Sequence, residues 1–219
     1  MTIKFSAVLL GASLMIGASA QAAVIGGLSN SVVLEDFENL ENLGFITTGP
    51  VALAAGQVIA TSNVIATYDS LPVDLGSNGA WGTDGYVGIG DYYNFSTTPS
   101  PTDSLTFTSL AGLSSLGADF SIYQDEFTTE DLLLEALSYD GSVLESTLVA
   151  IAFQDPASYN RSAFYGFARA SNDIFGLRVT GDGFVIDNLS TAVVPEPGAL
   201  PLLVSALGVF FGLRRKKSQ

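Results

Sequence analysis

The sequence predicts an all-β protein: a single jelly-roll-like antiparallel β-sandwich, flanked by an N-terminal signal peptide and a C-terminal transmembrane helix. Three observations lead to this prediction. Short runs of β-branched and aromatic residues alternate with Gly, Asp, Asn, Ser and Pro along most of the chain. With 47% hydrophobic and 14% charged residues, the chain can bury a core of ordinary domain size. Each end carries an apolar stretch of its own kind, which leaves residues 24–193 for the sandwich.

The first segment, residues 1–23, has the features of a secretory signal peptide. A single lysine precedes an uncharged run that extends to Ala20. The small residues of Ala20-Gln21-Ala22 then match an A-x-A cleavage site. We expect the secretion machinery to engage this segment and signal peptidase to cleave around Ala22 or Ala23. An uncleaved membrane anchor is the alternative.

Several runs in the exported domain have the composition of strands, and their spacing favours an antiparallel sandwich. These runs are residues 31–37, 56–62, 104–109, 117–123, 164–169, 175–181 and 183–190.

The clearest supersecondary unit is a β-hairpin over residues 132–153. Its centre is Asp140-Gly141, the pair favoured in type I′ turns. Before the turn, Leu134, Ala136 and Ser138 alternate with Glu135, Leu137 and Tyr139, as residues on the two faces of a strand do. Residues 128–137 also fit a helical period, so a helix there is the alternative.

Charge and composition exclude several classes of function. Residues 24–194 hold 21 acidic residues against three arginines, which gives 3 − 21 = −18. Such a surface repels phosphate backbones, so we expect no nucleic-acid partner. The chain has no His and no Cys, which excludes Ser-His-Asp and Cys-His triads, zinc sites with His or Cys ligands and redox cysteine pairs.

The glycine-rich, aromatic segment 74–95 is the best candidate for a binding surface. Sugars stack on aromatic faces beside carboxylates and amides. The candidate glycan contacts are Trp81, Asp84, Tyr86 and Tyr92. The alternative is that these aromatic residues fill the core and that the glycines serve tight turns.

A carboxylate-based glycosidase is the less favoured functional alternative. Glycoside hydrolysis needs two carboxylates about 5–10 Å apart. The candidates within residues 125–135 are Glu126, Glu130, Asp131 and Glu135. Random pairs meet that spacing easily in so acidic a chain. We therefore predict no catalytic residues.

The last segment, residues 194–219, has three parts. An extended Val194-Pro195-Glu196-Pro197 comes first, because each proline fixes φ and keeps its predecessor out of the α region. A transmembrane helix is expected over about 199–213, and the basic tail Arg214, Arg215, Lys216 and Lys217 follows. Basic residues stay on the cytoplasmic side, which places the domain outside the membrane. At ~1.5 Å per residue the helix is short for a ~30 Å hydrocarbon core, so local thinning or snorkelling is needed.

This combination of motif, apolar span and basic tail resembles the PEP-CTERM sorting signal, also described as an ice-binding-protein C-terminal domain. The resemblance implies a Gram-negative host that makes exopolysaccharide. It also implies that the precursor is anchored in the inner membrane. An exosortase would then cleave near the motif and pass the product to the envelope, outer surface or extracellular matrix. An ordinary single-span anchor is the alternative.

Two stretches at opposite ends of the domain are expected to lie together. Residues 35–40 form an acidic and aromatic stretch at the start of the domain, and residues 184–190 end it. Exported domains that carry the PEP-CTERM signal often begin and end with stretches similar to these. First and last strands are commonly adjacent in jelly rolls. Similar carbohydrate-binding modules often hold a structural calcium there. Asp36, Glu38 and Asp187 could supply its oxygen ligands, and solvated edge carboxylates are the alternative.

The sequence thus predicts an exported, surface-sorted, non-enzymatic protein of the envelope or exopolysaccharide matrix. The main alternative is a lectin-like module that binds glycans.

Overall fold

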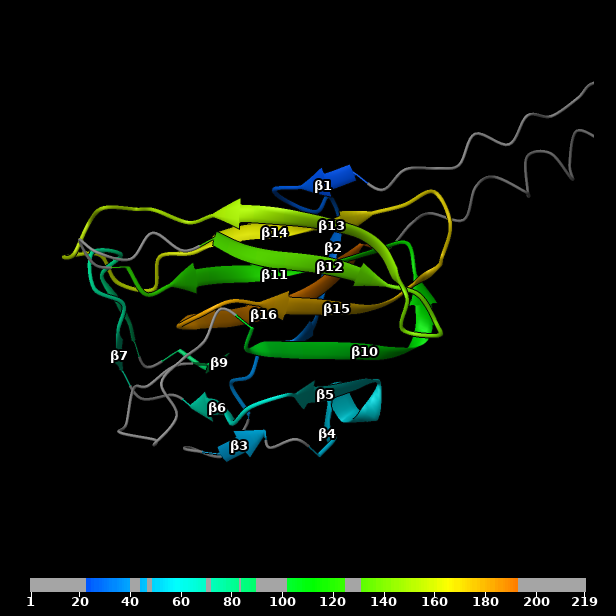
Figure 1. Cartoon of the computed structure of the whole chain (residues 1–219), viewed down its shortest axis with the longest axis horizontal. Coiled ribbons are helices and arrows are strands. Elements are labelled where there is room, and N and C mark those ends of the chain that lie inside the picture. The colour runs from blue at the N-terminus through cyan, green and yellow to red at the C-terminus, as the bar shows by residue number, and fades with distance from the viewer. Residues whose placement is uncertain are drawn as a thin grey trace, which may run out of the picture.

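The computed structural model describes residues 23–39, 44–46, 49–69, 72–82, 84–89, 102–124 and 131–192. In these residues the protein is almost entirely antiparallel β-structure, and two sheets face each other (Figure 1). This confirms the predicted all-β class. Only one short 3₁₀ turn, η1 (Ala54–Gly56), occurs within the described residues.

Sheet A contains eight strands, and β2 (Ser31–Glu35) lies beside the second half of β16. The order of the other seven is β1 (Ala23–Ile25), β14 (Ala163–Ala168), β11 (Ser115–Ile122), β16 (Phe184–Ala192), β9 (Tyr86–Ile89), β6 (Ala66–Asp69) and β3 (Gly44–Ile46).

Sheet B contains six strands in the order β13 (Val143–Ala150), β12 (Asp131–Leu137), β15 (Ile174–Thr180), β10 (Ser104–Leu113), β5 (Val58–Ser62) and β4 (Val51–Leu53). A third, two-stranded unit consists of β7 (Val73–Asp74) and β8 (Ala80–Trp81).

The core lies between the two sheets because alternate residues of each strand point inward. In β11, for example, Phe120 and Ile122 are fully buried in this core. Phe107 of sheet B enters from the opposite side and packs against Phe37, with ring centroids 6.2 Å apart. Seven predicted runs overlap strands β2, β5, β10, β11, β14, β15 and β16.

The predicted hairpin is confirmed, because β12 and β13 pair antiparallel from Asp131↔Ala150 to Leu137↔Val143. The helical alternative is therefore wrong over residues 131–137, which pair with both β13 and β15. The predicted turn type is also wrong. A type I′ turn requires positive φ at both central residues. Gly141 has a left-handed φ of 80°, but Asp140 is not among the residues with positive φ.

The two stretches that were expected to lie together meet where β2, the second strand, pairs with β16, the last one. Glu35 at the end of β2 pairs with Leu189 of β16, and Ser31 pairs with Ala192. The two ends of the described domain lie at the same end of sheet A. Ala23 opens β1 opposite Ala168, and Ser115 pairs with the same residue from the other side. Ser115 Oγ accepts a hydrogen bond from the backbone N–H of Ala192 at 2.8 Å.

The two processing segments lie outside the described residues. Residues 1–22 of the predicted signal peptide, the motif at 194–197 and the basic tail at 214–217 all fall there. A search of the described residues finds no helix of sufficient length and hydropathy to cross a bilayer.

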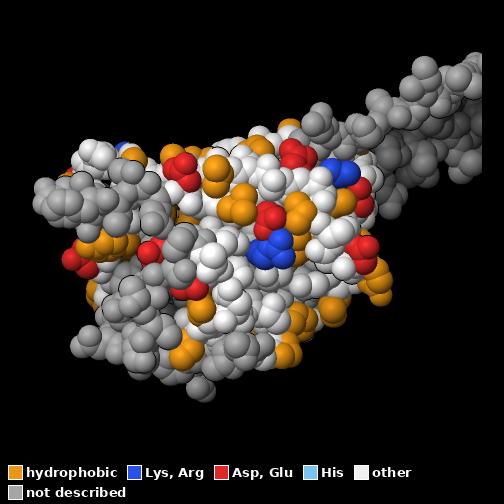
Figure 2. Space-filling model, in the orientation of Figure 1, with side chains coloured by type: hydrophobic (Ala, Val, Ile, Leu, Met, Phe, Trp, Pro, Cys, Tyr) orange, Lys and Arg blue, Asp and Glu red, His pale blue; other side chains and the backbone are white. Residues whose placement is uncertain are grey.

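The three arginines of the domain are each paired with a carboxylate. Arg178 Nε of β15 lies 2.5 Å from Glu135 Oε2 of β12, in the middle of the outer face of sheet B. In the space-filling view of this face, basic side chains are few and the central one touches an acidic one (Figure 2). Arg169 pairs with Asp173 at 2.7 Å. Arg161 lies 3.6 Å from Asp155, and it also covers the ring of Phe153.

Candidate functional site

Two aspartates lie opposite each other on the outer face of sheet A. Asp119 of β11 and Asp187 of β16 are paired in register, and opposed side chains in such pairs lie about 5 Å apart. Their neighbours Phe120 and Ile186 belong to the inter-sheet core, so the two carboxylates point to the other face. Asp187 is nevertheless only 4% exposed.

Asn188 joins these two carboxylates. Its Nδ2 donates to Asp187 Oδ2 at 2.8 Å and to Asp119 Oδ2 at 3.2 Å, and its backbone N–H donates to Asp187 Oδ1 at 2.6 Å. The backbone of Asn188 is left-handed, with φ of 51°. Asparagine adopts this conformation more readily than most residues, which explains its place at the irregular step of β16.

Two further carboxylates face Asp187 and complete what we call the carboxylate cluster: Glu38, Asp84, Asp119 and Asp187. Burial raises the pKa of Asp187 to about 7, and repulsion from Asp84, Asp119 and Glu38 adds to the effect. Burial also raises the pKa of Asp119. All three arginines of the domain are paired elsewhere, so no described cation neutralises the cluster.

The expected calcium ligands are partly brought together. Glu38 lies within electrostatic range of Asp187, and Glu38 Oε1 accepts the backbone N–H of Gly85 at 2.9 Å. Asp36 is exposed, and its carboxylate accepts the backbone N–H of Glu38 at 3.2 Å. In the described part of the chain, no three carboxylates are close enough to hold a metal ion. The calcium site therefore stays a prediction, and Asp119 and Asn188 are the neighbours that sequence reasoning missed.

Trp81 and Tyr86, two of the predicted glycan contacts, are buried. They form a second hydrophobic cluster with Val73, Leu75 and Val185 on the outer face of sheet A. Trp81 is 2% exposed and Tyr86 is fully buried. Neither ring offers a face to a sugar in this arrangement, which agrees with the alternative that these aromatic residues fill a core. Tyr92 lies outside the described residues.

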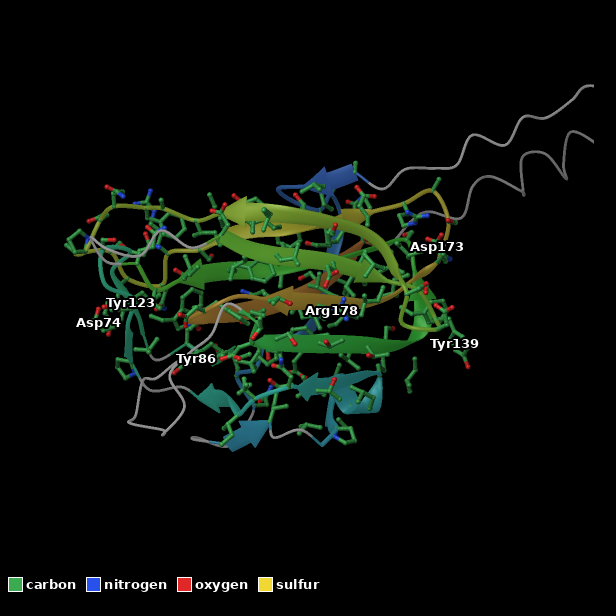
Figure 3. All side chains as sticks on the ribbon, viewed as in Figure 1. Asp74, Tyr86, Tyr123, Tyr139, Asp173 and Arg178 are labelled. Carbon is green, nitrogen blue, oxygen red and sulfur yellow. The ribbon has the colours of Figure 1, made fainter. Side chains whose placement is uncertain are left out.

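The β7–β8 hairpin is fixed over this cluster by a buried asparagine. Asn78 is 1% exposed. Its Nδ2 donates to the carbonyl oxygens of Ile122 and Ile151 at 2.9 and 3.0 Å, and its Oδ1 accepts the N–H of Phe153 at 2.7 Å. The hairpin is thereby attached to the ends of both sheets. In Figure 3, Asp74 and Tyr123 mark this end of the molecule, and Tyr139 and Asp173 mark the opposite end.

An exposed tyrosine lies beside the hairpin. Tyr159 is 61% exposed and is bridged to Ala80 of β8. Its ring edge lies against Gly82, where an added Cβ would come within 2.3 Å of Tyr159 Cε1. The absence of a side chain at Gly82 therefore leaves room for the ring.

Polar groups adjoin this ring. Asn160 Nδ2 donates to Asp84 Oδ2 at 3.4 Å, and Asn160 Oδ1 accepts the backbone N–H of Gly82. We call Gly82, Asp84, Tyr159 and Asn160 the Tyr159 patch. Asp84 was predicted from the sequence, whereas Tyr159 and Asn160 were missed because no pattern in their loop marks them.

Comparisons with known proteins add little to this geometry. No family model and no curated protein matches the chain. Among solved structures, the chain is similar to a DUF4465 family protein from Bacteroides caccae, with 8% identity and a TM-score of 0.34 over 84% of this chain and 97% of that one.

Two carbohydrate-binding structures are also similar, each with 14% identity over 78% of this chain. CtCBM11 has a TM-score of 0.29 and is covered over its full length, 100%. The family 11 carbohydrate-binding module of the cellulase Lic26A-Cel5E of Clostridium thermocellum has a TM-score of 0.22 and is 99% covered. TM-scores this low carry no argument about the fold family or the function of this chain.

Proposed function

We propose that the chain is an exported, non-enzymatic protein of the cell envelope or exopolysaccharide matrix that binds glycans at the Tyr159 patch. The observation that carries this proposal is an exposed tyrosine ring, held against Gly82 beside a carboxylate and an amide. An aromatic face can stack on the C–H groups of a sugar ring, while adjacent planar polar groups form hydrogen bonds with its hydroxyl groups.

The charge of the domain supports neutral glycans as the ligands. At −18 over residues 24–194, from 3 − 21, the domain repels uronate-rich polysaccharides. Arg161 is the cation nearest to the patch in sequence, and Asp155 already pairs with it at 3.6 Å. Asp84 and Asn160 instead offer hydrogen-bond acceptors and donors that suit hydroxyl groups.

Two observations support binding rather than hydrolysis. Asp119 and Asp187 have a spacing that glycosidases use, but Asp187 is 4% exposed and Asn188 bridges the pair. A glycosidic bond does not reach such a carboxylate. Glu135 is ion-paired with Arg178 at 2.5 Å. Glu126 and Glu130 lie outside the described residues.

The route to the envelope is part of the proposal and is supported by the sequence resemblance alone. Signal peptidase would release the domain near Ala22, and β1 begins at the next residue, Ala23. An exosortase would cleave near Val194–Pro197 after the basic tail has held the precursor in the inner membrane. The two-sheet arrangement, with β2 paired to the last strand β16, supports a jelly-roll-like form of the sandwich.

Glycan binding is tested by affinity electrophoresis of the purified protein in gels that contain the host's own exopolysaccharide. Tyr159→Ala should remove most of the retardation, because loss of one stacking ring costs about 1 kcal/mol or more. Tyr139→Ala is the matched control: Tyr139 is 84% exposed and packs on Phe175 at the opposite end of the molecule. Equal retardation of both variants, or none of the wild-type protein, would contradict the proposal.

A further inference from the structure

A groove lies where β2 of sheet A approaches the turn after β4 of sheet B. Its volume is about 570 Å³, within the range of small-molecule sites, about 300–1,000 Å³. The groove lies apart from the Tyr159 patch, because η1 and the β7–β8 hairpin are at opposite ends of the molecule (Figure 1). Its lining includes Val33, Glu35, Asp36, Asn39, Ala52 and Gln57.

One wall of the groove is a turn in an unusual conformation. Ala54, Ala55 and Gly56 have successive left-handed φ values of 50°, 53° and 87°. Non-glycine residues rarely adopt this region, and such outliers gather at ligand-binding and other functional sites. The turn exposes backbone and small side chains along the wall, so it leaves space that larger residues would fill.

Glu35 holds this turn in place. Its Oε2 accepts the N–H of Ala54 at 2.6 Å and its Oε1 accepts the N–H of Phe37 at 3.1 Å. On the other side, the backbone N–H of Gln57 donates to the carbonyl of Ala54 at 3.1 Å, and the backbone carbonyl of Gln57 accepts the N–H of Leu110 at 3.1 Å. The strained wall is therefore fixed before any ligand arrives, which lowers the entropic cost of binding.

The groups at the opening determine the class of ligand. Asp36, Asn39 and Gln57 are exposed and carry one carboxylate and two amides, and Val33 adds an apolar surface. No Lys or Arg lines the groove among the described residues. Amides donate and accept hydrogen bonds in a plane, which suits hydroxyl groups, whereas an anion would meet an acidic wall without a cation.

We infer that this groove is a second saccharide site and that it binds neutral mono- or disaccharide units. The site extends the proposed glycan binding but uses none of the residues of the Tyr159 patch. A chain with one site at each end can join two strands of polysaccharide, which a single patch cannot do.

The test records ¹⁵N spectra of the purified full chain during titration with glucose, mannose, galactose and cellobiose. Side-chain amide signals report the two sites separately, through Asn39 and Gln57 for the groove and Asn160 for the patch. We expect saturable shifts of Asn39 and Gln57 with at least one neutral sugar. Galacturonate and glucosamine are the charge controls, and equal or stronger shifts with either would overturn the neutral assignment.

Two variants complete the test. Ala52→Phe places a ring in the groove from an exposed position on β4 and should abolish the Asn39 and Gln57 shifts. Val32→Phe adds the same ring at an exposed position of β2 outside the lining and should leave them unchanged. Groove shifts that survive Ala52→Phe, or that never occur, overturn the inference.

The spectra also separate this inference from the proposed function. Shifts confined to Asn160 would overturn the groove and leave the patch. Shifts confined to Asn39 and Gln57 would support the groove and count against the patch. No shift at any of the three amides would overturn both.

Discussion

Replacing Asp187 by asparagine should stabilise the protein at neutral and alkaline pH. The carboxyl is buried beside three other carboxylates, and its pKa is raised from 3.8 to about 7. A carboxyl whose pKa is higher in the folded chain than in the unfolded chain destabilises the fold at pH values above its pKa in the unfolded chain. The cost grows from about pH 4 and is complete above about pH 7, so acidification through this window stabilises the fold.

The magnitude follows from the shift in pKa. About three pH units at 1.36 kcal/mol each give a cost of about 4 kcal/mol at pH 8. The amide introduced by the substitution would accept only one of the two hydrogen bonds that Asn188 donates to the carboxylate, a loss of about 1 kcal/mol. Asp187→Asn should therefore gain about 3 kcal/mol at pH 8 and less than about 1 kcal/mol at pH 5, where the wild-type carboxyl is mostly protonated.

Urea denaturation at pH 5 and pH 8 measures these differences, with the fluorescence of buried Trp81 as the signal. Asp131→Asn is the control, because Asp131 is an exposed aspartate at the start of β12. Its substitution should not reproduce the gain in stability at pH 8. A wild-type protein that is equally stable at both pH values, or an Asp187→Asn variant that is less stable at pH 8, would refute the reasoning.

Two further predictions concern the ion and the sorting signal. Calcium should raise the melting temperature at pH 8 more than magnesium does at equal ionic strength, because magnesium dehydrates reluctantly, and Asp187→Asn should abolish that selectivity; equal shifts from both ions would indicate screening alone. In a host that contains the exosortase, Glu196→Ala or deletion of residues 214–217 should leave uncleaved precursor, and mass spectrometry of the wild-type mature protein should find no peptide beyond the motif.

The strands were predictable where one local pattern determined them. Alternation and the Asp140-Gly141 pair located the β12–β13 hairpin, since Gly141 takes the left-handed φ that the turn needs. The exact turn was not predictable. It closes through hydrogen bonds from the N–H of Gly141 to the carbonyl of Ser138 and from the N–H of Ser138 to the carbonyl of Ser142. The pairing register also shifts between Ala136 and Leu137, a feature that the residue pair at the turn does not indicate.

The site was predictable only in part, because burial depends on tertiary contacts. Trp81 in a glycine-rich segment suggested an exposed ring, yet the hairpin that carries it is attached by Asn78 to the ends of two distant strands. Glu38 lies near Asp187, as the calcium hypothesis requires. Asp84, which was predicted only as a glycan contact, lies near Asp187 too, and Asp119 joins them through its cross-strand pairing with Asp187. Nothing in the sequence around Tyr159 indicates that a glycine of another loop would receive its ring.

The position where the chain leaves the domain has a consequence for the orientation of the precursor. Ala23 and Ala192 lie at the same end of sheet A: Ala23 and Ser115 flank Ala168, and Ala192 is hydrogen-bonded to Ser115. The nine residues of β16 run from there to the end at Phe184, and at about 3.3 Å per residue they span roughly 30 Å. In the anchored precursor that the sequence predicts, strand β16 would run away from the membrane, with the Ala192 end of the domain nearest the bilayer. Its Tyr159 end would point into the periplasm, where it could meet polysaccharide before the tether is cut.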